Sequence, residues 1–310
     1  MKTRAIGGLR VSEVGLGCNN FGVRLDASRT AEVVHAALEA GITFFDTADV
    51  YGETRSEEYL GRALGSRRAH VIVATKFGMP IEGGAGGASP AYVKQALDAS
   101  LRRLGTDYVD LYQLHRPDPD VPVAETLGAL GDLIQAGKVR EIGSSNFSAE
   151  QIRATSTARP GRPAFVSVQN EYSLLKRTPE LEVLRECTER GVAFIPYFPL
   201  AGGLLTGKYQ PGEPPPSGTR LTEPNSRLAP RFLKEDQVAS AGQLDALAKN
   251  RGHSVLDLAF AWLLGRPAVA SVIAGATSAA QVRANAAAAR WTLSAADFAE
   301  IDRITPPAQA

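Results

Sequence analysis

The chain of 310 residues is long enough to bury a large hydrophobic core, and its content of 44% hydrophobic and 22% charged residues is typical of soluble globular proteins. The net charge of +1 and the lack of a basic block argue against a nucleic-acid partner. No stretch approaches the roughly 18 apolar residues that cross a membrane, and no signal-like stretch opens the sequence, so we expect no membrane association and, by default, a cytoplasmic location.

Short apolar runs alternate with helical patterns along the chain. The first strand and helix pairs span 14–17 and 30–41, 42–46 and 55–65, 70–76 and 89–105, and 108–115 and 123–137. The later ones span 139–145 and 148–156, 164–169 and 178–191, strand 192–197, and 269–275 and 279–289. The clearest helix has Ser89 as its N-cap and Pro90 at its first position, and it ends at Gly105.

Eight units of this kind indicate parallel strands, because a helix connects each strand to the next. A doubly wound sheet would use six or seven, whereas eight favour an α/β fold of the (β/α)8 TIM barrel type, whose typical size is ~250 residues. We predict a single barrel domain over 1–310. Three segments exceed this plan, namely a short N-terminal hairpin at 1–13, a long Pro/Gly-rich loop after strand seven at 201–235, and an extra helix at 253–265. The Gly-rich stretch at 83–89 predicts a flexible loop after strand three.

Polar side chains end several of the predicted strands. Asp46 ends the second strand, Lys76 the third and His115 the fourth, and Tyr51 lies on the loop that follows Asp46. The carboxyl ends of the strands in such a barrel meet at one mouth, so these four side chains should lie together. A buried lysine beside a carboxylate stays protonated, and a tyrosine beside that ammonium should have a pKa below the ~10 of a free phenol. This tyrosine could act as a general acid while the histidine holds a carbonyl oxygen.

The sequence resembles the aldo-keto reductases over essentially its whole length. The matching stretches, in the expected order, are GITFFDTADVYG, VIVATKFG, DLYQLHRPD, REIGSSNFS, VQNEYSLL and LAGGLLTGKY. The resemblance implies a (β/α)8 barrel that binds NADPH without a Rossmann fold and reduces the carbonyl group of aldehydes or ketones. It also implies that Asp46, Tyr51, Lys76 and His115 are the catalytic residues, and all four are present.

The resemblance further implies a set of cofactor-binding residues. They are Ser145, Asn146 and Gln169 at the carboxamide, Tyr197 stacked on the nicotinamide, Phe198, Pro199, Leu200, Gly202 and Lys208 around the diphosphate, Arg220 folded over the cofactor, and Gly275, Thr277, Gln281 and Asn285 at the adenosine end. The start of a helix at the adenosine end suits an anionic ribose phosphate. On the loop after the first strand, Asn20 and Phe21, together with Asn19, are expected to contact the substrate.

Some positions depart from the family pattern. Phe198 stands where the family usually has serine, and Ala284 precedes Asn285 where a glutamate is frequent. Gln281 stands where some members have arginine. NADH therefore stays an alternative to NADPH. The only cysteines, Cys18 and Cys187, form no C-x-x-C pair, so we expect no metal site and no disulfide framework.

Several functional alternatives stay open. A single charged residue at a strand end is often structural, but four with this spacing favour catalysis. Within the enzyme class, a sugar or polyol dehydrogenase that works in the oxidative direction is the alternative to a carbonyl reductase. A rival from another class is a cofactor-binding regulatory subunit of a membrane channel. The sequence leaves the substrate, the direction, the oligomeric state and the path of the 201–235 loop undetermined.

Overall fold

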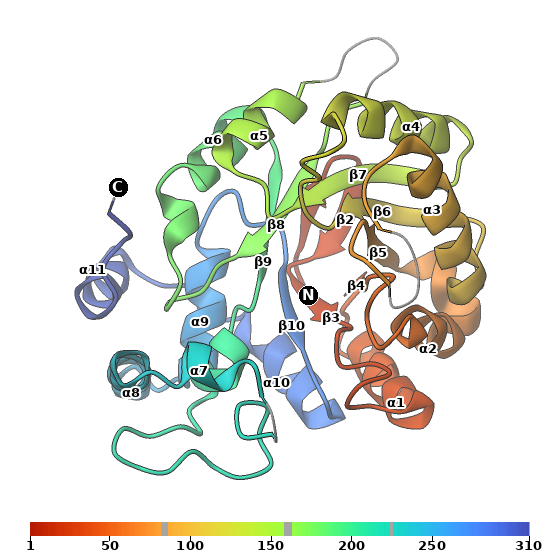
Figure 1. Ribbon diagram of the computed structural model, residues 1–310. Helices are drawn as coiled ribbons and strands as arrows, with labels where there is room; N and C mark the ends of the chain where they lie inside the picture. Colours follow the sequence, from red (N-terminus) through yellow and green to blue (C-terminus); the bar gives the residue numbers. More distant parts are fainter. Residues whose placement is uncertain (82–85, 158–162, 224–225, 310) are drawn as a thin grey trace.

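Eight parallel strands form a barrel in the structure of the chain, a computed structural model that describes residues 1–81, 86–157, 163–223 and 226–309 (Figure 1). The strands are β3 (Val14–Gly17), β4 (Phe44–Asp46), β5 (Ile72–Phe77), β6 (Val109–Leu114), β7 (Val139–Ser145), β8 (Ser167–Glu171), β9 (Ala193–Tyr197) and β10 (Val272–Gly275). Neighbours pair in the order β10, β3, β4, β5, β6, β7, β8, β9. An isolated parallel bridge joins Phe194 of β9 to Val269, which lies just before β10 in the chain. The predicted barrel is confirmed.

Helices surround the barrel (Figure 1). Those that connect consecutive strands, or follow the last one, are α1 (Ala27–Glu39), α2 (Arg55–Leu64), α3 (Pro90–Leu104), α4 (Val123–Gln135), α5 (Ala149–Thr155), α6 (Val183–Arg190) and α10 (Ala279–Ala288). The predicted ends of α3 are confirmed, because the Ser89 side chain accepts from the Tyr92 N–H and Gly105 adopts a left-handed conformation. The predicted helix at 178–191 is divided into a short 3-10 turn, Thr178–Glu180, and α6.

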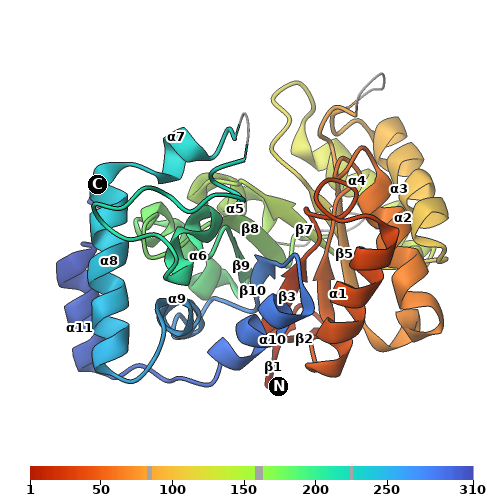
Figure 2. The same cartoon turned by 90° about the horizontal axis from the view of Figure 1, so that it is seen from below.

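An antiparallel hairpin of β1 (Thr3–Ile6) and β2 (Leu9–Ser12) closes one end of the barrel, as predicted. Its side chains Ile6, Leu9 and Val11 are buried in one cluster with residues of the barrel interior, among them Phe44 and Leu111. Each fully buried side chain of this size contributes about 1.5–3 kcal/mol. Figure 2 shows the hairpin at one end of the barrel and α7 (Ala229–Phe232) at the other. The hairpin therefore leaves the opposite end open.

The connection from β9 to β10 holds more helix than the sequence predicts. The expected helix at 253–265 is α9 (Val255–Leu264), but α8 (Glu235–Asn250) precedes it, and α11 (Ala295–Ile304) follows the barrel and packs on α8. The buried face of α8 includes Ala241 and Ala248, and α11 buries only Asp297 and Ile301, so neither helix gives a strong hydrophobic pattern in the sequence. The segment predicted as a loop at 201–235 also contains the 3-10 turn Ala201–Thr206 and α7. Residues 224–225 of that loop and 82–85 of the Gly-rich loop lie outside the described residues.

Candidate active site

A buried ion pair lies at the open end of the barrel, where β4 and β5 end. The Nζ atom of Lys76 donates to Asp46 Oδ2 over 2.6 Å and to the Thr47 carbonyl over 2.9 Å. The other carboxylate oxygen, Oδ1, accepts from the side-chain amides of Gln113 (3.2 Å) and Gln169 (2.9 Å). Lys76 is fully buried. Both charges thus have several partners, which is what a buried pair needs to offset desolvation.

The Lys76 ammonium is stable in this position. Burial lowers the pKa of Lys76, but the Asp46 carboxylate and the Tyr51 hydroxyl outweigh it, and the net pKa lies above its ordinary value. A positive charge is therefore held beneath the open end of the barrel at neutral pH.

Tyr51 lies directly over this charge. The Lys76 Nζ atom is 5.1 Å from the centroid of the Tyr51 ring, and the side chain is half-buried. Burial raises the pKa of the Tyr51 hydroxyl, and the Lys76 ammonium lowers it only in part, so the net direction is upward. The sequence-based expectation of a lowered pKa is wrong for this structure, because desolvation exceeds the attraction of the ammonium. Tyr51 is consequently a protonated phenol at neutral pH.

His115 follows β6 and faces Tyr51. Their ring centroids are 5.8 Å apart, and the planes meet at 79° in an edge-to-face arrangement. Burial and the positive charges of Lys76 and Arg116 lower the pKa of His115 to about 3. The imidazole is therefore neutral and carries one N–H. Its Nδ1 atom has no hydrogen-bond partner within the described part of the chain.

A hydrogen-bonded network extends from this centre over the ends of β7, β8 and β9. Asn146 Nδ2 donates to the His115 carbonyl (2.9 Å), and Asn146 Oδ1 accepts from the Tyr197 hydroxyl (2.9 Å). Ser145 Oγ donates to the Gln169 carbonyl over 2.8 Å. Asn146 holds a left-handed backbone, with φ of 62°, a conformation that costs energy and is concentrated at functional sites. The network fixes the residues that were expected to hold a carboxamide.

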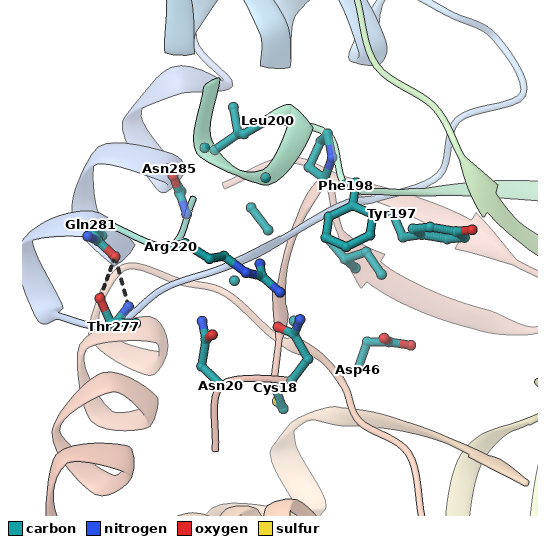
Figure 3. Close-up of a pocket in the computed structure, with 18 of the residues that line it drawn as sticks. Cys18, Asn20, Asp46, Tyr197, Phe198, Leu200, Arg220, Thr277, Gln281 and Asn285 are labelled. Carbon is teal, nitrogen blue, oxygen red and sulfur yellow. Dashed lines mark hydrogen bonds between the residues drawn. The ribbon is translucent and has the colours of Figure 1, made fainter. Parts of the chain in front are cut away.

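A cavity of about 700 Å³ opens over these groups. Its size is that of a small-molecule site. The lining includes Asp46, Tyr51 and His115, with Lys76 below the floor. All residues expected at the cofactor also line it, namely Ser145, Asn146, Gln169, Tyr197, Phe198, Pro199, Leu200, Gly202, Lys208, Arg220, Gly275, Thr277, Gln281 and Asn285. Figure 3 shows part of this wall, from Asp46 to Gln281.

Of the residues expected to contact the substrate, two line the cavity and one does not. Asn20 and Asn19 line the cavity, and the Asn20 amide also donates to the Ala276 carbonyl over 3.3 Å. The prediction for Phe21 is wrong, because its ring is fully buried in the core between the strands and the helices. Cys18 lines the wall as a neutral thiol, since burial raises its pKa well above the usual value.

Three cations gather along the cavity. Arg24 pairs with Glu223 over 2.7 Å and so connects the loop after β3 with the long loop after β9. Burial and the Arg24 charge lower the pKa of both Lys208 and Arg220. In Figure 3 the Arg220 side chain extends into the space between Phe198 and Asn20. A cluster of like charges of this kind favours an anion between them. Sequence reasoning missed Arg24, which lies in a loop without a motif.

The far end of the cavity lies at the start of α10. Gln281 Oε1 accepts from the backbone N–H of Thr277 (2.8 Å) and from its hydroxyl (3.2 Å), as Figure 3 shows. Ser278 caps the helix, and Asn285 is buried one turn further on. A helix N-terminus attracts negative charge, so this end suits an anionic group.

The sequence model of the aldo/keto reductase family matches residues 13–306. The chain belongs to the aldo/keto reductase family. It is 36% identical over 307 residues to the aldo-keto reductase YhdN of Bacillus subtilis, covering 96% of this chain and 91% of that protein. It is 38% identical over 289 residues to a probable voltage-gated potassium channel subunit beta of Oryza sativa, covering 90% and 87%.

Solved structures agree with the sequence matches. The holo form of aldo-keto reductase AKR11C1 from Bacillus halodurans superimposes with a TM-score of 0.82 at 34% identity, covering 99% of this chain and 97% of that one. The family makes this aldo/keto reductase an oxidoreductase by class. Within the described ranges, no group of three or more His, Cys, Asp or Glu side chains could hold a metal ion. No helix there is long and apolar enough to span a membrane.

Another buried carboxyl group of this aldo/keto reductase lies near the Lys76–Asp46 pair. Asp49 is fully buried, and its backbone N–H donates to the Lys76 carbonyl over 3.1 Å. Neither carboxylate oxygen has a hydrogen-bond partner among the residues that the structure describes. Burial and the negative charge of Glu57, which is itself paired with Arg103, raise the pKa of Asp49 to about 7. The Asp49 carboxyl group is therefore substantially protonated in the folded protein at neutral pH.

We expect an Asp49→Asn variant to lose a pH dependence of stability between about pH 4 and pH 7. The unfolded chain releases this proton near its ordinary pKa of 3.8, whereas the folded protein keeps it until about 7. The folded state binds more protons in this window, so the free energy of unfolding falls as pH rises, by at most about 4 kcal/mol. Urea unfolding at pH 5, 6, 7 and 8 measures the effect.

The difference between the wild type and Asp49→Asn isolates the contribution of Asp49 to the pH dependence of stability. The depressed pKa of His115 gives the opposite slope, since it lowers stability as pH falls below about 6.5, but it does so in both proteins. Parallel curves of unfolding free energy against pH for the wild type and Asp49→Asn would contradict the prediction.

Proposed function

We propose that this protein is an NADPH-dependent oxidoreductase that reduces the carbonyl group of a small aldehyde or ketone. Aldo/keto reductases as a family act on such compounds. The observation that carries the proposal is the buried Lys76–Asp46 pair beneath Tyr51, with a neutral His115 opposite. Asp46, Tyr51 and His115 line one cavity, and Lys76 lies below its floor. These groups can supply a proton and orient an oxygen at the same point.

The chemistry of the four side chains follows from their charge states. The nicotinamide, when bound, would supply a hydride to the carbonyl carbon. Tyr51, a protonated phenol, donates its proton to the carbonyl oxygen, and the Lys76 ammonium stabilises the phenolate that this leaves. Asp46 holds Lys76 in place and keeps it charged. For alcohol oxidation the same groups work in reverse.

His115 serves as a neutral hydrogen-bond donor to the carbonyl oxygen. A pKa of about 3 excludes the imidazolium at neutral pH, so this histidine does not compete with Tyr51 as the acid. A second donor at the developing oxyanion typically contributes about 2.7–4 kcal/mol to catalysis.

The cavity offers positively charged and N–H donors that suit the phosphates of a dinucleotide. The cations Arg24, Lys208 and Arg220 would hold the diphosphate, and the helix start at Thr277 the phosphate of the ribose. Phe198 and Ala201, beside them, have left-handed backbones with φ of 52° and 47°, strain that is typical of a binding loop. Tyr197 would stack on the nicotinamide, and Ser145, Asn146 and Gln169 would hold its carboxamide.

A cofactor titration tests this assignment. We expect NADPH to quench the intrinsic fluorescence. It should bind about 10–100-fold more tightly than NADH, because one charge-assisted hydrogen bond to the additional phosphate changes the affinity by about this factor. Loss of NADPH absorbance on addition of an aldehyde would then show turnover. An Arg220→Gln variant should weaken both cofactors alike, since the diphosphate is common to them. No quenching by either cofactor would reject the cofactor site.

A second candidate is a cofactor-binding channel subunit. The observation that favours it is the 38% identity to a probable voltage-gated potassium channel subunit beta. Turnover far slower than cofactor exchange, together with a stoichiometric membrane partner in a pull-down, would support this candidate. A sugar or polyol dehydrogenase would use the same residues, and faster oxidation of alcohols by NADP+ than reduction of aldehydes would identify it.

A further inference from the structure

Arg116 is a cation at the reaction end of the cavity. It follows His115 directly, is exposed, and lines the cavity together with Tyr51 and Tyr197. Burial is the main cause of the lowered pKa of His115 and of the raised pKa of Tyr197, and the Arg116 charge makes a smaller downward contribution to each, which places Arg116 within electrostatic reach of both. Sequence reasoning treated it as part of the family stretch and gave it no role.

Arg116 has no carboxylate partner in the described part of the chain. The nearby Asp118 is engaged elsewhere, since its Oδ2 accepts from the Ala88 N–H (2.7 Å) and its Oδ1 from the Asp120 N–H (2.9 Å). Arg116 is therefore available to a molecule that enters the cavity.

The positive and negative charges that line the cavity do not balance. Four basic residues line it, Arg24, Arg116, Lys208 and Arg220, against one carboxylate, Asp46. Asp46 is saturated by its hydrogen bonds to one lysine and two glutamines. The Arg24 charge acts on both Lys208 and Arg220, and the three cations fit a dinucleotide phosphate. Among the described lining residues, Arg116 alone remains as a cation without an assigned anion.

We propose that the carbonyl substrate carries an anionic group, a carboxylate or a phosphate ester, which Arg116 binds while the carbonyl oxygen meets Tyr51 and His115. The inference rests on the proposed carbonyl reduction. A guanidinium presents donors in a planar fork that matches either oxyanion in two parallel hydrogen bonds. Because Arg116 adjoins His115 in the chain, the anionic group lies close to the carbonyl in a short substrate. The pairing selects the substrate and leaves the chemical step to the other residues.

Matched substrates test the inference. Steady-state rates with NADPH are measured for 4-formylbenzoate and its neutral methyl ester, and for glyceraldehyde 3-phosphate and glyceraldehyde, in the wild type, Arg116→Gln and Arg116→Lys. An Arg29→Gln variant, on the exposed surface of α1, controls for loss of one positive charge. The wild type should prefer the anionic member of at least one pair. In Arg116→Gln the ratio of kcat/KM within that pair should fall about tenfold, mainly through KM, with partial retention in Arg116→Lys.

The outcomes distinguish a failure of the Arg116 inference from a failure of the proposed carbonyl reduction. A larger effect in the benzoate pair identifies a carboxylate, and a larger effect in the glyceraldehyde pair identifies a phosphate. Reduction of both neutral aldehydes, with ratios that Arg116→Gln leaves unchanged, would overturn the inference and leave carbonyl reduction standing. An equal shift of the pH profile for anionic and neutral substrates would also overturn it, because Arg116 would then act through His115. If no aldehyde is reduced, the proposed function fails and the inference with it.

Discussion

A Tyr51→Phe variant should lose turnover by about 10²–10⁴-fold while its affinity for NADPH stays near that of the wild type. The change removes one oxygen, the donor that lies over the Lys76 ammonium, and keeps the ring and its edge contact with His115. The remaining neutral imidazole can still polarise a carbonyl, but its pKa of about 3 leaves it without the extra proton that an acid needs at neutral pH. The loss should therefore appear in kcat.

The measurement for Tyr51 combines kcat with a fluorescence titration of NADPH. A Tyr59→Phe variant on α2, outside the residues that line the cavity, is the matched control and should behave as the wild type. Retention of most of the turnover in Tyr51→Phe would remove Tyr51 from the role of general acid. Loss of NADPH binding in that variant would instead show that the hydroxyl serves the cofactor site.

The convergence of the central residues was predictable from the sequence. Asp46, Lys76 and His115 each follow an apolar run, and the alternation of such runs with helices requires parallel strands. Parallel strands bring their carboxyl ends to one side, so the three positions had to meet whatever the details of packing. The structure confirms the barrel and places Lys76 Nζ 2.6 Å from Asp46 Oδ2.

Other parts of the site depend on information that local patterns lack. Gln113 lies in β6, a strand that is buried on both faces. Because apolar and polar residues do not alternate in such a strand, the sequence does not show which side chains point into the barrel. The hydrogen bond from Gln113 to Asp46 was therefore not predicted. The Arg24–Glu223 pair joins two loops whose paths depend on packing. Phe21 was expected at the substrate because its loop reaches the cavity, but the ring turns into the core.

The protonation states of the site residues also could not be predicted from the residue types alone. The position of Lys76 beside Tyr51 suggested a lowered pKa for the Tyr51 hydroxyl. Burial outweighs the lysine and raises this pKa, and the depth of burial is known only from the folded structure. The same holds for Asp49, whose pKa is raised by burial and by the nearby negative charge of Glu57. Sequence therefore identified the participants, and the fold determined which protons they keep.

A Lys76→Met variant should be destabilised by about 3–5 kcal/mol and should lose most of its activity. Methionine fills a similar volume, so packing is largely kept, but the Asp46 charge stays buried without its cation. Tyr51 loses the ammonium that would stabilise its phenolate. Urea unfolding at pH 7 and kcat for an aldehyde measure the two effects.

The double variant Lys76→Met/Asp46→Asn separates stability from catalysis. It removes the uncompensated charge, and the asparagine oxygen can still accept from the side-chain amides of Gln113 and Gln169, so both glutamines keep this acceptor. Most of the lost stability should return, because replacing both members of a buried pair is often neutral. The activity should stay low, since no cation remains beneath Tyr51. Recovery of kcat together with stability would mean that the pair serves the fold alone, and the acidity of Tyr51 would then need another source.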